Sequence, residues 1–172
     1  YLPSEVIGSH AGLSIEVIDT DAEGRLILAD GLSYMVKNYQ PDQLVDFATL
    51  TGSSIGTFGY ECAALFSNEG DLSHGLQKAG EEVGEKSWPL PLWDAYGKEM
   101  DSEIADIKNF HGKPFAGAIT AAKFLQAFTH EHSAWAHLDI AGVAFSDSEF
   151  SKTKTGTAYG VSLLLKFIEN QL

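Results

Sequence analysis

The sequence predicts an α/β domain, a three-layer α/β/α sandwich whose sheet is mixed but mainly parallel. Three observations favour this fold class. Strand-like segments alternate along the chain with segments of helical period. The runs at 43–50 and 63–66 are apolar almost throughout, as expected for strands that helices cover on both faces. A length of 172 residues suits one such domain with a sizeable core.

The first part of the chain predicts two strands with a helix between them. Residues 13–18 alternate apolar and polar side chains near their centre, which indicates a short strand. From residue 23 to residue 37 the apolar side chains recur every three or four positions, the period of an amphipathic helix. The run at 43–50 ends before Gly52 and is typical of a buried strand.

The rest of the chain continues the alternation. Residues 63–66 predict another buried strand, and the polar segment 71–86 has helical character that weakens at Gly84. Three prolines between residues 88 and 115 predict short helices and loops in a surface excursion. A helix, a strand and a closing helix are then expected at 119–128, 134–140 and 158–172.

Composition and charge exclude several classes of partner. The chain has 24 acidic and 11 basic residues, and its formal net charge of -13 would repel phosphate groups. We therefore expect no nucleic-acid partner. No apolar run approaches the roughly 20 residues that cross a bilayer, so no membrane association is expected. Cys62 is the single cysteine and fits a reducing, cytoplasmic compartment. Because the chain begins with Tyr1 and not with methionine, we expect an upstream region to be missing.

An acidic segment follows the first expected strand. Asp21 and Glu23 stand two positions apart, and in an extended chain such side chains project from the same face. Carboxylates that converge in this way can hold divalent cations. The same segment also fits a capping box, in which Thr20 and Glu23 satisfy amide groups at a helix start. On spacing alone the capping box is the commoner use of this pattern.

A longer string favours the metal interpretation. Residues 18–30, Ile-Asp-Thr-Asp-Ala-Glu-Gly-Arg-Leu-Ile-Leu-Ala-Asp, resemble the signature Asn-Thr-Asp-Ala-Glu-Gly-Arg-Leu of the leucyl aminopeptidase (cytosol aminopeptidase) family. The resemblance extends over nearly the whole chain, with further matching segments in the same order and at similar spacing. These segments are 46–52, 105–109, 117–125 and 135–142.

The resemblance implies a zinc-peptidase type of fold and a dinuclear metal centre. It implies that Asp21 binds one of two divalent ions, zinc or manganese, and that Glu23 bridges both. Arg25 would then hold a bicarbonate ion that accepts a proton from the water between the metals. Two cations lower the pKa of such a water and polarise the scissile carbonyl group. The implied activity is removal of amino-terminal residues from peptides.

The resemblance also implies where the substrate binds and how the protein assembles. Residues 49–52 match a loop that contacts the substrate backbone, through Thr49, Leu50 and Gly52. Ala141 and Ala144 match positions that line the pocket for the released side chain. Members of the family form hexamers, so a homo-oligomer is expected.

Three departures from the family pattern have consequences. Asp19 replaces the usual asparagine and adds negative charge beside the metal ligands, and Ala144 replaces a larger methionine, which would widen the pocket. The remaining metal ligands and a catalytic lysine have no counterpart in residues 1–172. We interpret these residues as the carboxy-terminal part of a catalytic domain that is inactive by itself. The alternative is a non-catalytic structural or assembly domain of the same fold.

A serine hydrolase is a second alternative. Residues 52–56 fit the pattern G-x-S-x-G after an expected strand, and Ser54 could act with Asp106 and His137. This motif requires a helix directly after the serine, whereas residues 57–60 predict a turn and a strand. Of the histidines, His137 is expected to be a buried or supporting residue, and the pair around residue 131 is expected in a solvated turn.

Overall fold

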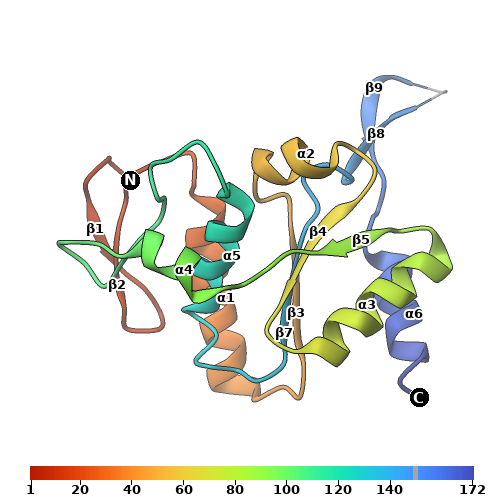
Figure 1. Ribbon diagram of the computed structural model, residues 1–172, viewed down its shortest axis with the longest axis horizontal. Coiled ribbons are helices and arrows are strands. Elements are labelled where there is room, and N and C mark those ends of the chain that lie inside the picture. The colour runs from red at the N-terminus through yellow and green to blue at the C-terminus, as the bar shows by residue number, and fades with distance from the viewer. Residues whose placement is uncertain (149–150) are drawn as a thin grey trace.

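A computed structural model describes residues 1–148 and 151–172 (Figure 1). Its main sheet has four strands in the order β3-β7-β4-β5. The strands β3 and β7 are parallel, as are β4 and β5, whereas β4 and β7 are antiparallel. The predicted mixed, mainly parallel sheet is therefore confirmed. The strand bounds are Leu44–Ala48 for β3, Ala63–Ser67 for β4, Ser87–Pro89 for β5 and Trp135–Asp139 for β7.

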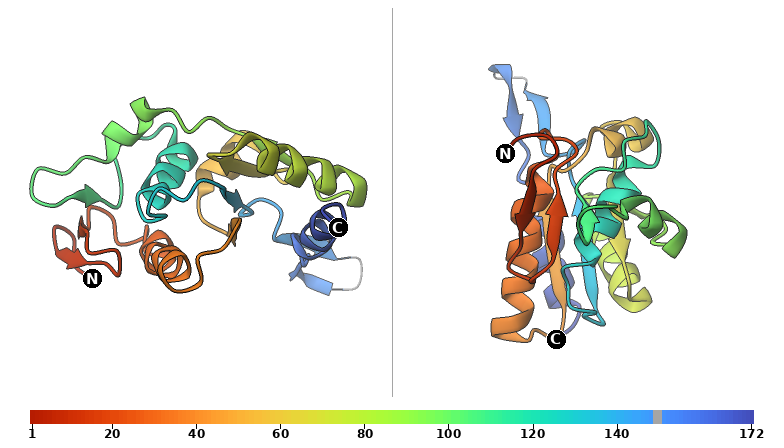
Figure 2. Two further views of the ribbon diagram at one scale, coloured as in Figure 1. Left: turned by 90° about the horizontal axis from the view of Figure 1, so that it is seen from below. Right: turned by 90° about the vertical axis from the view of Figure 1, so that its left-hand side faces the viewer.

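Helices pack on both faces of this sheet (Figure 2). The helices α1, Gly24–Tyr39, and α5, Gly117–Gln126, contribute to one apolar cluster. The helices α3, Gly70–Val83, and α6, Val161–Glu169, contribute to a second. The three-layer arrangement predicted from the sequence is confirmed.

The alternation of side chains along β4 shows why the chain forms two apolar clusters. Ala64 and Phe66 belong to the cluster with α1 and α5, whereas Leu65 between them belongs to the cluster with α3 and α6. Successive strand residues point to opposite faces of a sheet, and both faces here are covered. A continuous apolar run is the expected sequence for such a strand.

Smaller elements surround the main sheet. A three-stranded sheet has the order β1-β2-β6, and β8 and β9 form an antiparallel pair. The short helix α2 follows β3, and α4 and the 3₁₀ helix η1 precede β6. Their bounds are Val6–Gly8 for β1, Ser14–Glu16 for β2, Ile107–Lys108 for β6, Phe145–Ser148 for β8, Ser151–Gly156 for β9, Gly52–Phe58 for α2, Asp94–Gly97 for α4 and Lys98–Met100 for η1.

Two expectations from the sequence were wrong in part. Of the turn and strand expected at 57–60, only the turn forms, at residues 59 and 60, because α2 continues to Phe58 and ends at Gly59 with a φ of 62°. The hydroxyl of Thr51 accepts a hydrogen bond from the amide of Ser54 and starts this helix. The segment 88–115 is more than a surface excursion, because Met100 and Asn109 are buried.

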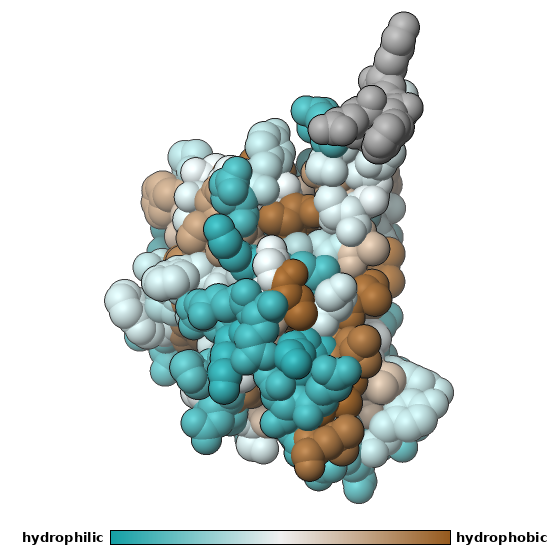
Figure 3. Space-filling model, turned by 90° about the vertical axis from the view of Figure 1, so that its right-hand side faces the viewer, coloured by the Kyte–Doolittle hydropathy of each residue, from teal (hydrophilic) through white to brown (hydrophobic). Residues whose placement is uncertain are grey.

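The outer face of the α3–α6 layer carries polar residues beside a stripe of apolar ones (Figure 3). The exposed large apolar residues of α6 are Val161, Leu165 and Ile168, which follow one side of the helix. Within the described ranges, no helix has both the length and the apolar character that crossing a membrane requires.

Candidate active site

A pocket of about 200 Å³ lies between the loop that leads into α1 and the turn that follows β3. In sheets of this kind, ligands bind beyond the carboxyl ends of strands. The pocket brings together four of the residues singled out from the sequence, and also Asp19, one of the two residues that depart from the family pattern. The four are Asp21, Arg25, Leu50 and Gly52.

A buried asparagine shapes the acidic loop. Asn109 follows β6, and its side-chain oxygen accepts hydrogen bonds from the amides of Ile18 and Asp19, at 2.8 and 3.2 Å. Its side-chain nitrogen donates to the carbonyl oxygens of Asp19 and Ala22, at 2.7 and 3.3 Å. Because Asn109 is fully buried, these four bonds hold the loop that carries Asp21 in one conformation.

The capping box proposed as an alternative does not form. The helix α1 begins after Glu23, so Glu23 and not Thr20 occupies the cap position, and the Glu23 side chain makes no capping hydrogen bond. The side chains of Asp21 and Glu23 are both exposed. Neither carboxylate accepts a hydrogen bond from any residue that the structure describes. Both are therefore available to a ligand from outside this chain.

The guanidinium group of Arg25 lies beneath the loop. Arg25 is 5% exposed, and its Nη1 donates to the carbonyl oxygen of Asn109 at 2.8 Å. Its Nε is buried and has no hydrogen-bond partner among the described residues. Burial lowers the pKa of Arg25 to about 10, and the negative charges of Asp139, Asp19 and Glu23 oppose this shift. The side chain remains a cation at neutral pH and keeps an unused donor, which suits an anion.

Asp139, at the end of β7, is a site residue that the sequence did not reveal. It is 1% exposed, and its Oδ1 accepts hydrogen bonds from the amides of Leu50, Thr51 and Ala141. Its Oδ2 accepts one from the hydroxyl of Thr51 at 2.6 Å. The sequence feature that could have identified Asp139 is its position, a carboxylate at the carboxyl end of an apolar strand, where ligands bind in such sheets.

The other predicted residues lie outside this pocket. Glu23 stands at the start of α1, and Thr49 is exposed in the turn after β3. Ala141 and Ala144 follow β7 and are half-buried, and the amide of Ala144 donates to the carbonyl oxygen of Ile140 at 2.9 Å. Phe110 and Gly117 line the pocket and were not predicted.

The carboxylates of Asp21 and Glu23 are suitable ligands for metal ions, but they are too few to hold two ions by themselves. Oxygen ligands suit zinc, manganese and magnesium. In the part of the chain that the structure describes, no three His, Cys, Asp or Glu side chains come together as a metal-binding group. Two carboxylates cannot complete the coordination of two divalent ions, each of which needs four or more ligands.

The serine hydrolase alternative is contradicted by the partners of its three residues. Ser54 is 2% exposed, lies inside α2 and donates its hydroxyl to the carbonyl oxygen of Thr51. His137 bonds through Nδ1 to Asp46 at 2.5 Å, and Asp106 accepts from Ser14. A nucleophilic serine must be accessible and contact its base, and Ser54 does neither.

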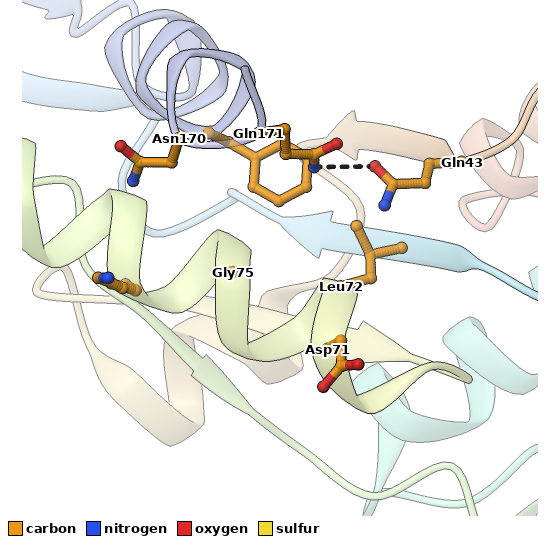
Figure 4. A pocket seen from close by; sticks show the side chains of 8 residues that line it. Gln43, Asp71, Leu72, Gly75, Asn170 and Gln171 are labelled. Atoms are coloured by element: carbon orange, nitrogen blue, oxygen red, sulfur yellow. Dashed lines mark hydrogen bonds between the residues drawn. The ribbon is translucent and has the colours of Figure 1, made fainter.

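A second hollow, of about 310 Å³, lies between α3 and α6 (Figure 4). Leu72 and Phe167 are among its lining residues, and Gln171 donates to Gln43, which also lines it, at 3.0 Å. Its only charged lining residues are Asp71 and Lys78. These groups offer no nucleophile with a base and no converging carboxylates, so the pocket beside Arg25 is the better candidate.

Comparison with known proteins gives a consistent result. Residues 1–165 match a family model described as the catalytic domain of the cytosol aminopeptidase family. Proteins named "Probable cytosol aminopeptidase" from Chloroherpeton thalassium and Chlorobaculum tepidum are 49% and 50% identical to the chain over 168 and 167 residues. These alignments cover 98% and 97% of the chain and 33% of each relative. The chain thus spans about a third of the length of the curated relatives it matches.

Proposed function

The chain belongs to the cytosol aminopeptidase family, and from this membership we propose that residues 1–172 form the carboxy-terminal part of a catalytic domain that removes amino-terminal residues from peptides. One observation carries the proposal. At the start of α1, the carboxylates of Asp21 and Glu23 are exposed and accept no hydrogen bond from the described chain, although a helix start offers free amides. Such carboxylates are ready to bind cations.

Asp21 and Glu23 are proposed as two of the ligands of a pair of divalent ions, zinc or manganese. When bound, such ions lower the pKa of a coordinated water and polarise a carbonyl group. Asp21 would contact one ion, and Glu23 would bridge the pair. The remaining ligands must come from outside these 172 residues, because among the described residues no group of three acidic, histidine or cysteine side chains could hold a metal ion. We therefore propose that the 172 residues alone are inactive.

Arg25 is proposed to hold an anion, with bicarbonate as the candidate. Three features of Arg25 support this role. It is buried, it keeps its positive charge at neutral pH, and its Nε has no partner among the described residues. A fixed cation with an unused donor offers an oxyanion both a charge and a hydrogen bond. The contact with the Asn109 carbonyl group keeps the guanidinium in place.

The turns after β3 and β7 are proposed to bind the peptide substrate. Leu50 and Gly52 line the pocket, and Thr49 is exposed beside them, so their backbone groups could contact the peptide. Ala141 and Ala144 would accommodate the amino-terminal side chain, and small residues there leave room for a large one. We further propose that the complete protein is a cytoplasmic homo-oligomer, as a hexamer.

The test uses the complete protein, including any region outside residues 1–172. Release of a chromophore from a leucyl anilide is measured with added manganese or zinc, for wild type and for Glu23→Ala. Because metal assistance contributes several kcal/mol, we expect kcat/KM to fall about a thousandfold in the variant. Glu81→Ala, which removes an exposed acid on α3, is the matched control.

Two results would contradict the proposal. One is equal turnover by Glu23→Ala and wild type at equal protein stability. The other is wild-type turnover that survives exhaustive chelation. A complete protein that binds no divalent ion and hydrolyses nothing would instead favour the non-catalytic structural domain.

A further inference from the structure

Asp139 connects two turns that come from different strands. Its Oδ1 accepts from the amides of Leu50 and Thr51, at 3.0 and 3.3 Å, in the turn after β3. The same oxygen accepts from the amide of Ala141 at 3.3 Å, in the turn after β7. The hydroxyl of Thr51 donates to Oδ2 at 2.6 Å. Four hydrogen bonds thus converge on one side chain that is 1% exposed.

The two turns are the ones proposed to bind the peptide. The first carries Leu50 and Gly52, which line the pocket, and the second carries Ala141. Hydrogen bonds to a carboxylate are shorter and stronger than those between neutral groups, and burial strengthens them further. The position of one turn relative to the other therefore depends on this carboxylate.

We propose that Asp139 is a positioning residue of the peptide-hydrolysing site, which sets the turn at Leu50 and Thr51 against the turn at Ala141. This inference rests on the proposed function and extends it to a residue that acts through the two turns to which it bonds. A purely structural role is the competing explanation. It predicts lower stability without any change in how the substrate is bound.

Asp46 provides a matched control for a structural role. It is a second acidic residue of the sheet, and its oxygens accept from Trp135 Nε1 at 2.9 Å and from His137 Nδ1 at 2.5 Å. Its register partner on β7 is His137, two positions before Asp139. Asp46 is therefore on the same sheet, but it bonds to neither substrate turn.

The experiment compares wild type, Asp139→Asn and Asp46→Asn as complete, manganese-loaded proteins. The Asp139 variant keeps an oxygen acceptor but loses the charge and the acceptor for the Thr51 hydroxyl. We expect KM for a leucyl substrate to rise about tenfold, as for the loss of one hydrogen bond to a charged group. The ratio of kcat/KM between leucyl and alanyl substrates should change as well. Asp46→Asn should lower the melting temperature and leave KM unchanged.

Amide hydrogen exchange provides a readout that does not need activity. Peptides that cover residues 49–52 and 140–142 should exchange faster in Asp139→Asn, while the rest of the sheet exchanges as in wild type. If the Asp139 variant fails to fold, Thr51→Val keeps the carboxylate and removes the hydroxyl that donates to Oδ2, together with the cap that this hydroxyl gives α2. Thr51→Val should raise KM several-fold.

The outcomes separate this inference from the proposed function. An active wild type whose Asp139→Asn and Thr51→Val variants keep KM, substrate preference and local exchange would overturn the positioning role alone. A complete wild-type protein that hydrolyses no leucyl substrate with either metal would overturn the proposed function and this role together.

Discussion

Three helices of this molecule begin beside a glutamate, and two of the glutamates are used differently from the third. At α3, Glu69 accepts hydrogen bonds from the amides of Asp71 and Leu72, at 2.9 and 2.6 Å. At α6, Glu85 accepts from the amides of Gly160 and Leu163, at 3.0 and 2.8 Å. At α1, Glu23 occupies the cap position and makes no such bond.

The difference separates residues that stabilise the fold from residues that are free for function. A side-chain cap satisfies amide groups that a helix start otherwise leaves without partners, and typically contributes about 1 kcal/mol. The α3–α6 layer gains this stabilisation, whereas the start of α1 does not. Places where a sequence pattern predicts a local bond that the structure does not make are often functional sites.

The first prediction has the largest expected effect on stability. It concerns Gly80 of α3, which packs against the turn from which Glu85 reaches the start of α6. A Cβ atom added at Gly80 would lie 2.3 Å from the carbonyl oxygen of Glu85 and 3.1 Å from Leu163 Cδ1. Gly80→Ala should therefore displace the turn that carries Glu85 and lower the free energy of unfolding by about 1–3 kcal/mol. Urea denaturation followed by circular dichroism measures the change.

Gly24→Ala is the control in the other region. At the start of α1, an added Cβ would meet only Leu50 Cδ1, at 3.7 Å, which is an ordinary contact. We expect this variant to be as stable as wild type, or slightly more stable because alanine favours a helix. If Gly80→Ala and Gly24→Ala lost the same amount of stability, the packing around the two glycines would not differ as their Cβ contacts indicate.

The second prediction compares the caps directly. Glu85→Ala removes the acceptor of two amides and should cost about 0.5–2 kcal/mol of stability. Glu23→Ala removes no capping bond and should change the stability by less than about 0.5 kcal/mol. Glu81→Ala, an exposed substitution on α3, sets the baseline. A Glu23 variant as unstable as the Glu85 variant would mean that Glu23 supports the helix after all.

The main features of the fold could be predicted from local patterns in the sequence. The helical period at 23–37 and the apolar runs at 43–50 and 63–66 correspond to α1, β3 and β4. The antiparallel pairing of β4 with β7 could not be located in this way, because side-chain period does not reveal strand direction. Helix α2 was missed because its start depends on a single threonine cap.

The candidate site was predictable only where its residues are neighbours in sequence. Asp21 and Arg25 belong to one string, and the structure places both at one pocket. Asn109 and Asp139 support that pocket through hydrogen bonds to residues about 90 positions away along the chain. No local pattern contains such a contact, so the supporting residues appear only once the chain is folded.

The third prediction has the smallest effect and concerns acid. Hydrogen bonds from the amides of Asp71 and then Leu72 lower the pKa of Glu69 from its ordinary value of 4.5. A carboxylate with a lowered pKa stabilises the folded state above that ordinary value, and the contribution disappears as the pH falls through the lowered folded pKa. Glu69→Gln should therefore be less stable than wild type at neutral pH, and the difference should vanish in strong acid.

Urea midpoints at neutral pH and at successive values below 4.5 test this prediction. The two curves for Glu69→Gln and wild type should converge as the pH falls, because the protonated Glu69 of wild type no longer offers the amides a charge. At neutral pH Glu23→Gln should be about as stable as wild type, since its side chain receives no capping hydrogen bond to lose. A loss of stability in Glu23→Gln as large as the loss in Glu69→Gln would mean that the carboxylate at the start of α1 stabilises its helix in solution, and the contrast between the two regions would then fail.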